Sequence, residues 1–291
     1  MTMPVNKLGV HALVFSGGTT PADVDYAIEQ TKLAGYDVLE LSLQDAQAID
    51  TAHAKAALEA AGLGVVCSRG LTFDADISSE DVAVVARGAE LLRTSVQAVH
   101  ELGGTLLTGA LYSAFGNYGR ALTAAGRANA VTVLKDAAKD AQGKGMTLGL
   151  EVCNRYETNV VNTAEQALAL ADDIGEDNVT VHLDSYHMNI EEDDFVRPFA
   201  LVGDRLGYVH IGENHRGYLG SGHLDFTTFF HSLADIGYTG GITFESFSSA
   251  VVSETLSTDL SIWRNLWNDG PALAKHAHTF ITNALEANEE H

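Results

Sequence analysis

The sequence alternates short apolar segments with longer helical patterns throughout, and this alternation restricts the fold more than any other feature. Eight apolar segments have the length and composition of strands, and they cover residues 8–15, 37–43, 64–71, 105–111, 147–153, 179–187, 206–213 and 240–247. Helical patterns follow them at about 21–34, 51–61, 78–102, 120–142, 163–174, 192–202, 225–236 and 257–288. Because strands that alternate with helices form parallel sheets, we expect an all-parallel sheet.

Eight strand–helix units in a chain of 291 residues predict one α/β domain, residues 1–291, folded as a closed (β/α)8 TIM barrel. An open, doubly wound sheet is the alternative fold. However, no predicted strand is followed by a glycine-rich dinucleotide-binding or phosphate-binding motif. For the same reason we expect no nucleotide cofactor.

Local signals support several of the predicted helix boundaries. Thr20 is a candidate N-cap with Pro21 in the first helical position, and Ser78 and Asp81 have the spacing of a cap before the third helix. Trp263 and Trp267 are four residues apart, so we expect them to pack on one face of the last predicted helix.

Charge and cysteine content exclude several classes of function. The chain has 39 acidic and 17 basic residues and a net charge of −22, which argues against nucleic-acid and anionic-membrane partners. It has neither a signal-peptide pattern nor an apolar run long enough to span a membrane. The two cysteines, Cys67 and Cys153, form no CxxC pair and fit small buried side chains. We therefore expect a soluble cytoplasmic protein.

Four polar residues lie near the carboxyl ends of consecutive predicted strands, and they are Glu151, Asp184, His210 and Glu245. Side chains alternate between the two faces of a strand, so the apolar neighbours can face the helices while these four point inward. Buried carboxylates are unfavourable unless they are paired or bound to a metal. Three carboxylates and one imidazole therefore predict a divalent-metal site. This donor set favours Mg²⁺ or Mn²⁺ and leaves zinc as an alternative.

Longer motifs surround these residues and resemble one enzyme family, the ketose 3-epimerases. These are the D-tagatose and D-allulose (D-psicose) 3-epimerases among the xylose-isomerase-like sugar isomerases. The resemblance extends over essentially the whole chain, and the segment HLDSYHMNIEED at 182–193 is its most specific part. The other motifs are EVCNRYE at 151–157, VHIGENHR at 209–216, FESF at 244–247, DLSIWR at 259–264 and SSED at 78–81.

The resemblance implies a set of roles for individual residues. It implies a Mn²⁺, Mg²⁺ or Co²⁺ ion held by the four polar residues named above, with Glu151 and Glu245 also serving as the acid/base pair. It implies that the sugar hydroxyls around C1 to C3 are bound by Glu157, His187 and Arg216. It also implies a free ketose as substrate and a homodimer or homotetramer.

Barrel geometry is consistent with this chemistry. The fifth and eighth strands lie on opposite sides of an eight-stranded barrel, so Glu151 and Glu245 can flank a sugar and exchange the proton at C3 through a metal-stabilised cis-enediolate. In allulose epimerases the first strand often carries aromatic residues, and here it reads His11, Ala12, Leu13, Val14 and Phe15. Phe115 stands where a tryptophan is common, and these differences leave the preferred ketose open. His11 fits a core histidine and a pocket wall equally well.

Other functions share parts of this pattern. An aldose–ketose isomerase or a dehydratase of the same barrel group would use a similar metal site. An apurinic-endonuclease-like hydrolase would need more histidine ligands and a basic face, which the acidic composition opposes. A non-catalytic sugar-binding or metal-binding protein would leave the two opposed glutamates unexplained.

Overall fold

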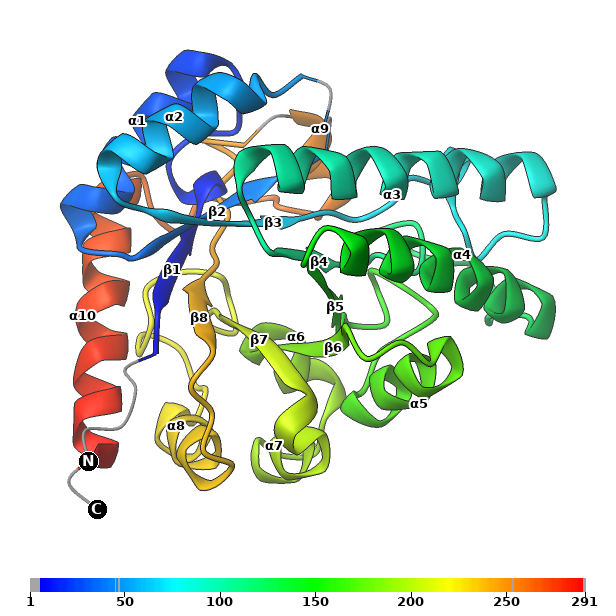
Figure 1. Ribbon diagram of the computed structural model, residues 1–291. Coiled ribbons are helices and arrows are strands. Elements are labelled where there is room, and N and C mark those ends of the chain that lie inside the picture. Colours follow the sequence, from blue (N-terminus) through cyan, green and yellow to red (C-terminus); the bar gives the residue numbers. More distant parts are fainter. Residues whose placement is uncertain (1–5, 45, 47, 253, 290–291) are drawn as a thin grey trace.

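The computed structural model describes residues 6–44, 46, 48–252 and 254–289, and its eight strands form a closed parallel barrel (Figure 1). The strands follow one another around the barrel in chain order, and β1 pairs with β8 to close it. The predicted barrel is therefore confirmed and the open sheet is excluded. The strands are β1 (Leu8–His11), β2 (Val38–Ser42), β3 (Gly64–Ser68), β4 (Leu106–Gly109), β5 (Thr147–Glu151), β6 (Val179–Asp184), β7 (Leu206–Ile211) and β8 (Gly241–Phe244).

Helices surround the strands on the outside of the barrel (Figure 1). Short 3₁₀ turns cover Ala12–Val14, Phe73–Ala75 and Gly203–Arg205. The α-helices are α1 (Pro21–Ala34), α2 (Thr51–Ala61), α3 (Val82–Leu102), α4 (Ala124–Gly143), α5 (Ala164–Ile174), α6 (Ser185–Glu191), α7 (Val196–Val202), α8 (Phe226–Asp235), α9 (Glu254–Asp259) and α10 (Gly270–Glu289).

Capping residues in the local sequence determine where several helices begin and end. The Thr20 side chain accepts a hydrogen bond from the Asp23 N–H, and the Asp23 carboxylate accepts one from the Thr20 N–H, so α1 begins with a complete capping box. Asp81 caps α3, which places the start of this helix after residue 78. Gly35 ends α1 with a φ of 94°, a left-handed conformation that side chains with a Cβ rarely adopt.

The predicted strands extend too far at their carboxyl ends. The sixth segment was predicted to be extended to residue 187, but β6 ends at Asp184 and α6 begins at Ser185. Likewise, β1 ends at His11 and passes into a 3₁₀ turn. Apolar residues continue past the last paired residue because they remain buried while the chain turns over the barrel mouth. His187 therefore lies on a helix rather than at a corner between strand and loop.

The prediction of one continuous last helix was wrong. The helix α9 ends at Asp259, and residues 260–269 are not helical before α10 begins. Trp263 is 73% exposed, whereas Trp267 is 4% exposed and its indole N–H donates to the Ser246 hydroxyl at 2.8 Å. The two tryptophans therefore do not share a helix face.

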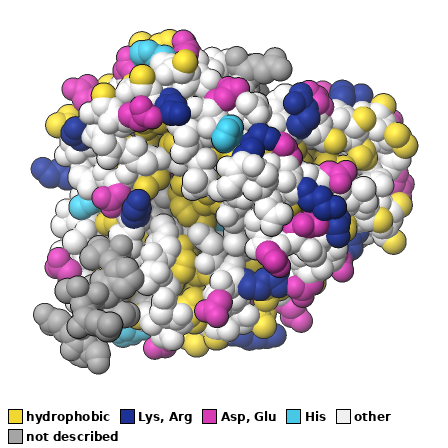
Figure 2. Space-filling model, in the orientation of Figure 1, with side chains coloured by type: hydrophobic (Ala, Val, Ile, Leu, Met, Phe, Trp, Pro, Cys, Tyr) yellow, Lys and Arg dark blue, Asp and Glu magenta, His cyan; other side chains and the backbone are white. Residues whose placement is uncertain are grey.

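Charged side chains of both signs lie on the surface. Figure 2 shows acidic and basic side chains interspersed on one face of the molecule, without a large basic patch. Within the described ranges, no helix is both long and apolar enough to cross a membrane.

Candidate metal centre and active site

The structure brings together the four polar residues predicted at the strand ends. Glu151 ends β5, Asp184 ends β6, His210 is the penultimate residue of β7, and Glu245 directly follows β8. All four are buried, and one potential ligand atom from each lies within 4.8 Å of the others. The parallel register produces this cluster because the carboxyl ends of all eight strands meet at one end of the barrel.

The cluster fits a divalent cation. Two of its buried atoms, Oδ2 of Asp184 and Nδ1 of His210, make no hydrogen bond in the described part of the chain. Nδ1 of His210 lies 3.5 Å from a carboxylate oxygen of Glu151 and 3.5 Å from one of Glu245. Buried carboxylates at this spacing repel one another unless positive charge lies among them. The donor set therefore suits a hard or borderline divalent ion.

The two glutamates have different electrostatic environments. Burial raises the pKa of Glu151, and the nearby Glu245 carboxylate acts in the same direction. Burial also opposes ionisation of Glu245, but His210 and the Arg216 guanidinium outweigh it and hold the pKa of Glu245 well below its usual value. Burial disfavours the charged form of His210, yet Glu40 and Glu245 raise its pKa well above the ordinary value. The site thus places two carboxylates of unlike acidity around one imidazole.

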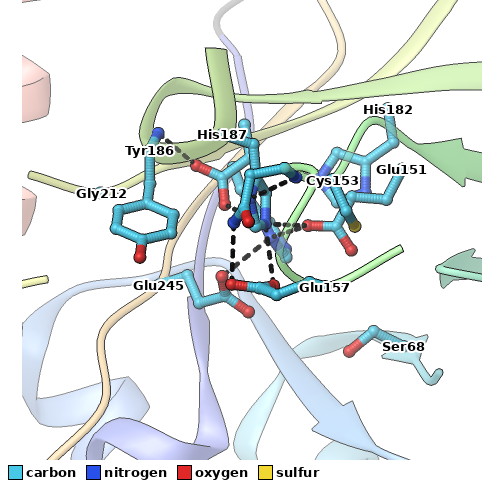
Figure 3. Close-up of polar contacts among 12 residues, drawn as sticks. Ser68, Glu151, Cys153, Glu157, His182, Tyr186, His187, Gly212 and Glu245 are labelled. Atoms are coloured by element: carbon cyan, nitrogen blue, oxygen red, sulfur yellow. Dashed lines mark hydrogen bonds and ion pairs between the residues drawn. The ribbon is translucent and has the colours of Figure 1, made fainter. Parts of the chain in front are cut away.

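A cavity of about 270 Å³ opens above the cluster. Figure 3 shows Glu151, Glu157 and Glu245 converging beside His187. These four residues and Arg216 line the cavity, whereas Asp184 and His210 lie outside its lining. The other lining residues are Phe115, Tyr186, Asn214, His215, Phe247, Leu260, Ser261, Ile262, Trp263, Arg264 and Leu266. The cavity therefore combines convergent polar and charged groups with apolar and aromatic side chains, as small-molecule sites commonly do.

Arg216 is held firmly over this cavity. Its Nη1 lies 3.1 Å from Oδ2 of Asp184 and 2.9 Å from Oε2 of Glu245. The guanidinium carbon also lies 4.0 Å from the centre of the Tyr186 ring. Arg216 has a φ of 59°, a conformation that is uncommon for residues other than glycine and that occurs often at functional sites. The sequence predicted a contact with the sugar, but it did not predict the ion pairs with Asp184 and Glu245.

His187 reaches the same space from α6. The backbone N–H of Asn154 donates to Nδ1 of His187 at 3.2 Å, so the neutral ring carries its hydrogen on Nε2. That nitrogen lies 3.8 Å from carboxylate oxygens of Glu151 and Glu157 and 3.7 Å from one of Asp184. His187 therefore presents a donor toward the cavity, and Glu157 lies beside it.

Three further buried polar residues around the cluster were not predicted from the sequence. Glu40 on β2 and His182 on β6 lie inside apolar strands, which is the same signal that pointed to the four clustered residues. Burial opposes ionisation of Glu40, but His210 and His11 hold its pKa below the usual value. Glu213 accepts hydrogen bonds from the N–H groups of Asn214 and Gly220. It thereby fixes the loop that carries Arg216.

His11 contacts the cluster from β1. Its Nε2 lies 3.5 Å from a Glu40 oxygen and 3.9 Å from one of Glu245. His11 is buried and does not line the cavity. Of the two interpretations left open above, the structure supports a core histidine. Phe115, in contrast, does line the cavity.

A larger groove of about 530 Å³ lies between α3 and α4, away from the strand ends. No histidine lines it, and four of its five charged residues form two ion pairs, Arg93 with Glu90 and Lys144 with Asp140. The chemistry therefore points to the smaller cavity at the barrel mouth.

Comparison with known proteins gives consistent matches along the chain. The family described as xylose isomerase-like TIM barrel matches residues 28–283. A ketose 3-epimerase from Arthrobacter globiformis is 47% identical over 281 residues, which is 97% of each chain. An L-ribulose 3-epimerase from Methylomonas sp. (strain DH-1) is 47% identical over 94% of this chain and 96% of its own. The crystal structure of a D-allulose 3-epimerase from Methylomonas sp. with D-allulose superposes with a TM-score of 0.95 at 46% identity. It covers 97% of this chain and 98% of its own.

Proposed function

The chain belongs to the ketose 3-epimerases of the xylose isomerase-like TIM barrel family, and on this basis we propose that it epimerises free ketoses at C3 with a divalent metal ion. The candidate reactions are D-fructose to D-allulose, D-tagatose to D-sorbose and L-ribulose to L-xylulose. The main structural support is the placement of Glu151 and Glu245 on β5 and after β8, next to one buried donor cluster.

The proposed metal centre uses Glu151, Asp184, His210 and Glu245, with Mn²⁺, Mg²⁺ or Co²⁺ as the ion. When bound, the ion supplies Lewis-acid stabilisation of the negative charge that develops on two adjacent sugar oxygens. The absence of cysteine from this set of four residues favours these ions over zinc.

The acid/base chemistry is assigned to the two glutamates. One carboxylate removes the C3 proton from one face of the sugar, which leaves an enediolate. The other carboxyl group returns a proton to the opposite face, and their roles exchange in the reverse direction. Because β5 and β8 are three steps apart around the barrel, their ends can lie on either side of a bound sugar. General acid–base catalysis of this kind contributes roughly 10²–10⁴-fold to a rate.

Three residues are assigned to sugar binding. Arg216 and the Nε2–H of His187 are donors that face the cavity, and the Glu157 carboxylate is an acceptor beside them. Together they can orient the hydroxyls around C1 to C3 so that the C3 hydrogen meets a glutamate.

The cellular setting is also a proposal. Both cysteines are buried and neither forms a disulfide, which supports a reducing, cytoplasmic compartment. Family membership supports a homodimer or homotetramer, and light scattering of the purified protein would distinguish the two.

The proposed activity predicts a specific product pattern. We expect the Mn²⁺-loaded protein to convert D-fructose, D-allulose or L-ribulose into its C3 epimer, with equilibrium approached from both directions. Chromatography of the sugars against standards would detect this. An aldose product would instead indicate an aldose–ketose isomerase, loss of water would indicate a dehydratase, and unchanged sugar would indicate a binding protein.

The sugar-binding assignment predicts that Arg216→Ala and His187→Ala lower kcat/KM by roughly 10–100-fold, because each removes a hydrogen-bond donor to the sugar. Neither variant should lose the metal. Arg127→Ala is a matched control, since its guanidinium pairs with Asp173 on the outside of the barrel. Stoichiometric loss of metal in either active-site variant would show that the assigned ligand set is wrong.

A further inference from the structure

A further buried carboxylate, that of Glu40, lies directly behind the proposed metal centre. Glu40 is fully buried and does not line the sugar cavity, so it cannot contact the substrate directly. Its Oε2 lies 2.8 Å from Nε2 of His210 and accepts a hydrogen bond from the Tyr208 hydroxyl at 2.8 Å. Its Oε1 makes no hydrogen bond in the described residues, and Nε2 of His11 is 3.5 Å from it. The proposed reaction gives this residue no role.

The contact between Glu40 and His210 determines which nitrogen of the imidazole ring carries the hydrogen. An ionised carboxylate can only accept hydrogen bonds, so at 2.8 Å Nε2 of His210 must donate. In the neutral ring, the lone pair then lies on Nδ1. That atom faces the cluster, 3.5 Å from oxygens of Glu151 and Glu245.

Packing keeps the His210 ring in this orientation. The His182 ring stands edge-on to it with the ring centres 4.2 Å apart, and Tyr208 contacts it at 5.5 Å. A flipped ring would turn Nδ1 away from the cluster and leave Glu40 opposite a carbon atom. The tautomer and the ring orientation therefore depend on the same carboxylate.

We propose that Glu40 is a positioning residue of the metal centre. Its carboxylate holds His210 in the Nε2–H tautomer, directs the Nδ1 lone pair toward the ion and makes the imidazole a stronger ligand. This inference rests on the proposed function, since it assumes that His210 is a ligand. Hydrogen-bond partners of metal-ligating histidines typically contribute about 10–100-fold to metal affinity.

The test compares Mn²⁺ binding by the wild type and Glu40→Gln, measured by isothermal titration calorimetry without sugar. Glutamine keeps the size of the side chain but removes its charge. We expect one ion per chain in both proteins and a Kd about 10–100-fold higher in the variant. Asp76→Asn is the matched control, because Asp76 is also buried and accepts from Ser78 and Tyr118 but belongs to none of the possible donor groups. Its Mn²⁺ affinity should equal that of the wild type.

A spectroscopic measurement separates positioning from a general loss of structure. In the Mg²⁺-loaded wild type, long-range ¹H–¹⁵N NMR should show the proton of His210 on Nε2, with the signal assigned by its loss in His210→Gln. At sub-saturating Mg²⁺, Glu40→Gln should show a second form of His210 with the hydrogen on Nδ1, because the ring can carry it there only when that nitrogen has left the ion. If this variant does not fold, Tyr208→Phe removes one hydrogen bond from the same oxygen, and its Mn²⁺ affinity should weaken by less than tenfold.

The other outcomes overturn the inference in distinguishable ways. Unchanged Mn²⁺ affinity and an unchanged tautomer in Glu40→Gln would reject the role of Glu40 alone. Two ions bound by the wild type and one by the variant would make Glu40 a direct ligand, since it forms a second possible donor group with His11 and Glu245. No Mn²⁺ binding by the wild type would reject the metal centre itself.

Discussion

Removal of divalent metal is expected to abolish epimerisation, and addition of Mn²⁺, Co²⁺ or Mg²⁺ is expected to restore it. Without an ion, the positive charge beside the buried carboxylates of Glu151, Asp184 and Glu245 comes from the Arg216 guanidinium and from the His210 imidazole when it is protonated. The charge that develops on the sugar oxygens would then lack its main stabilisation. A Lewis acid supplies several kcal/mol at such a centre, so the rate should fall by at least about 10³-fold.

The measurement follows metal content and rate together. Metal should be quantified by mass spectrometry before chelation, after chelation and after reloading, with the rate recorded at each stage. Because the ion binds the folded state and not the unfolded chain, it also stabilises the protein against unfolding. At an ion concentration of 100 times Kd this amounts to about 2.7 kcal/mol, which corresponds to a melting temperature roughly 4 °C higher for a chain of this size.

Two controls make the chelation experiment decisive. Asp184→Asn should reduce both the thermal shift and the rate, because it weakens one of the four assigned ligands. Arg127→Ala should change neither, because its ion pair lies on the outside of the barrel. Full activity in a demonstrably metal-free sample would contradict the Lewis-acid mechanism.

The fold and the donor cluster could be predicted from the sequence because both depend on regular patterns. Strand–helix alternation determines a parallel barrel, and a parallel barrel brings all strand ends to one mouth. A polar residue at the end of an apolar strand must then face inward. Glu40 has the same pattern on β2, beside His11 in the strand register, and the same reasoning applied to every strand would have identified it.

The loops could not be predicted in the same way. The position of Arg216 depends on a left-handed backbone conformation and on a loop held by Glu213, and neither follows a periodic pattern. Residues 260–269 contain enough apolar side chains to resemble a helix. In the structure several of these side chains form the cavity wall instead, including Leu260, Ile262 and Trp263. Tertiary contacts therefore override local propensity where the substrate is expected to bind.

Substitution of either of the two proposed acid/base glutamates is expected to block net epimerisation in both directions while leaving partial proton exchange. We expect Glu151→Gln and Glu245→Gln each to lower the rate by roughly 10²–10⁴-fold, because glutamine keeps the size and one oxygen ligand but cannot act as a base. Glu176→Gln is the matched control. Its carboxylate lies before β6, at the opposite end of the barrel, and contacts Lys135.

The exchange pattern distinguishes two bases on opposite faces from a single shared base. In Glu245→Gln, Glu151 can still exchange the C3 hydrogen of one epimer with solvent deuterium, although little product forms. In Glu151→Gln, exchange should favour the other epimer. This asymmetry follows because each carboxylate reaches only one face of the sugar.

Mass spectrometry of both sugars in deuterated water would measure this exchange, with metal occupancy determined in every variant because both glutamates are also assigned as ligands. Deuterium at C3 of one epimer in one variant, and of the other epimer in the second, would support the two-base mechanism. Loss of exchange with both epimers in a fully metal-loaded variant would instead assign both proton transfers to one carboxylate. If both metal-loaded variants epimerise at near wild-type rates, Glu151 and Glu245 are not the acid and base, and the chemistry must depend on another group in the cavity, such as Glu157 or His187.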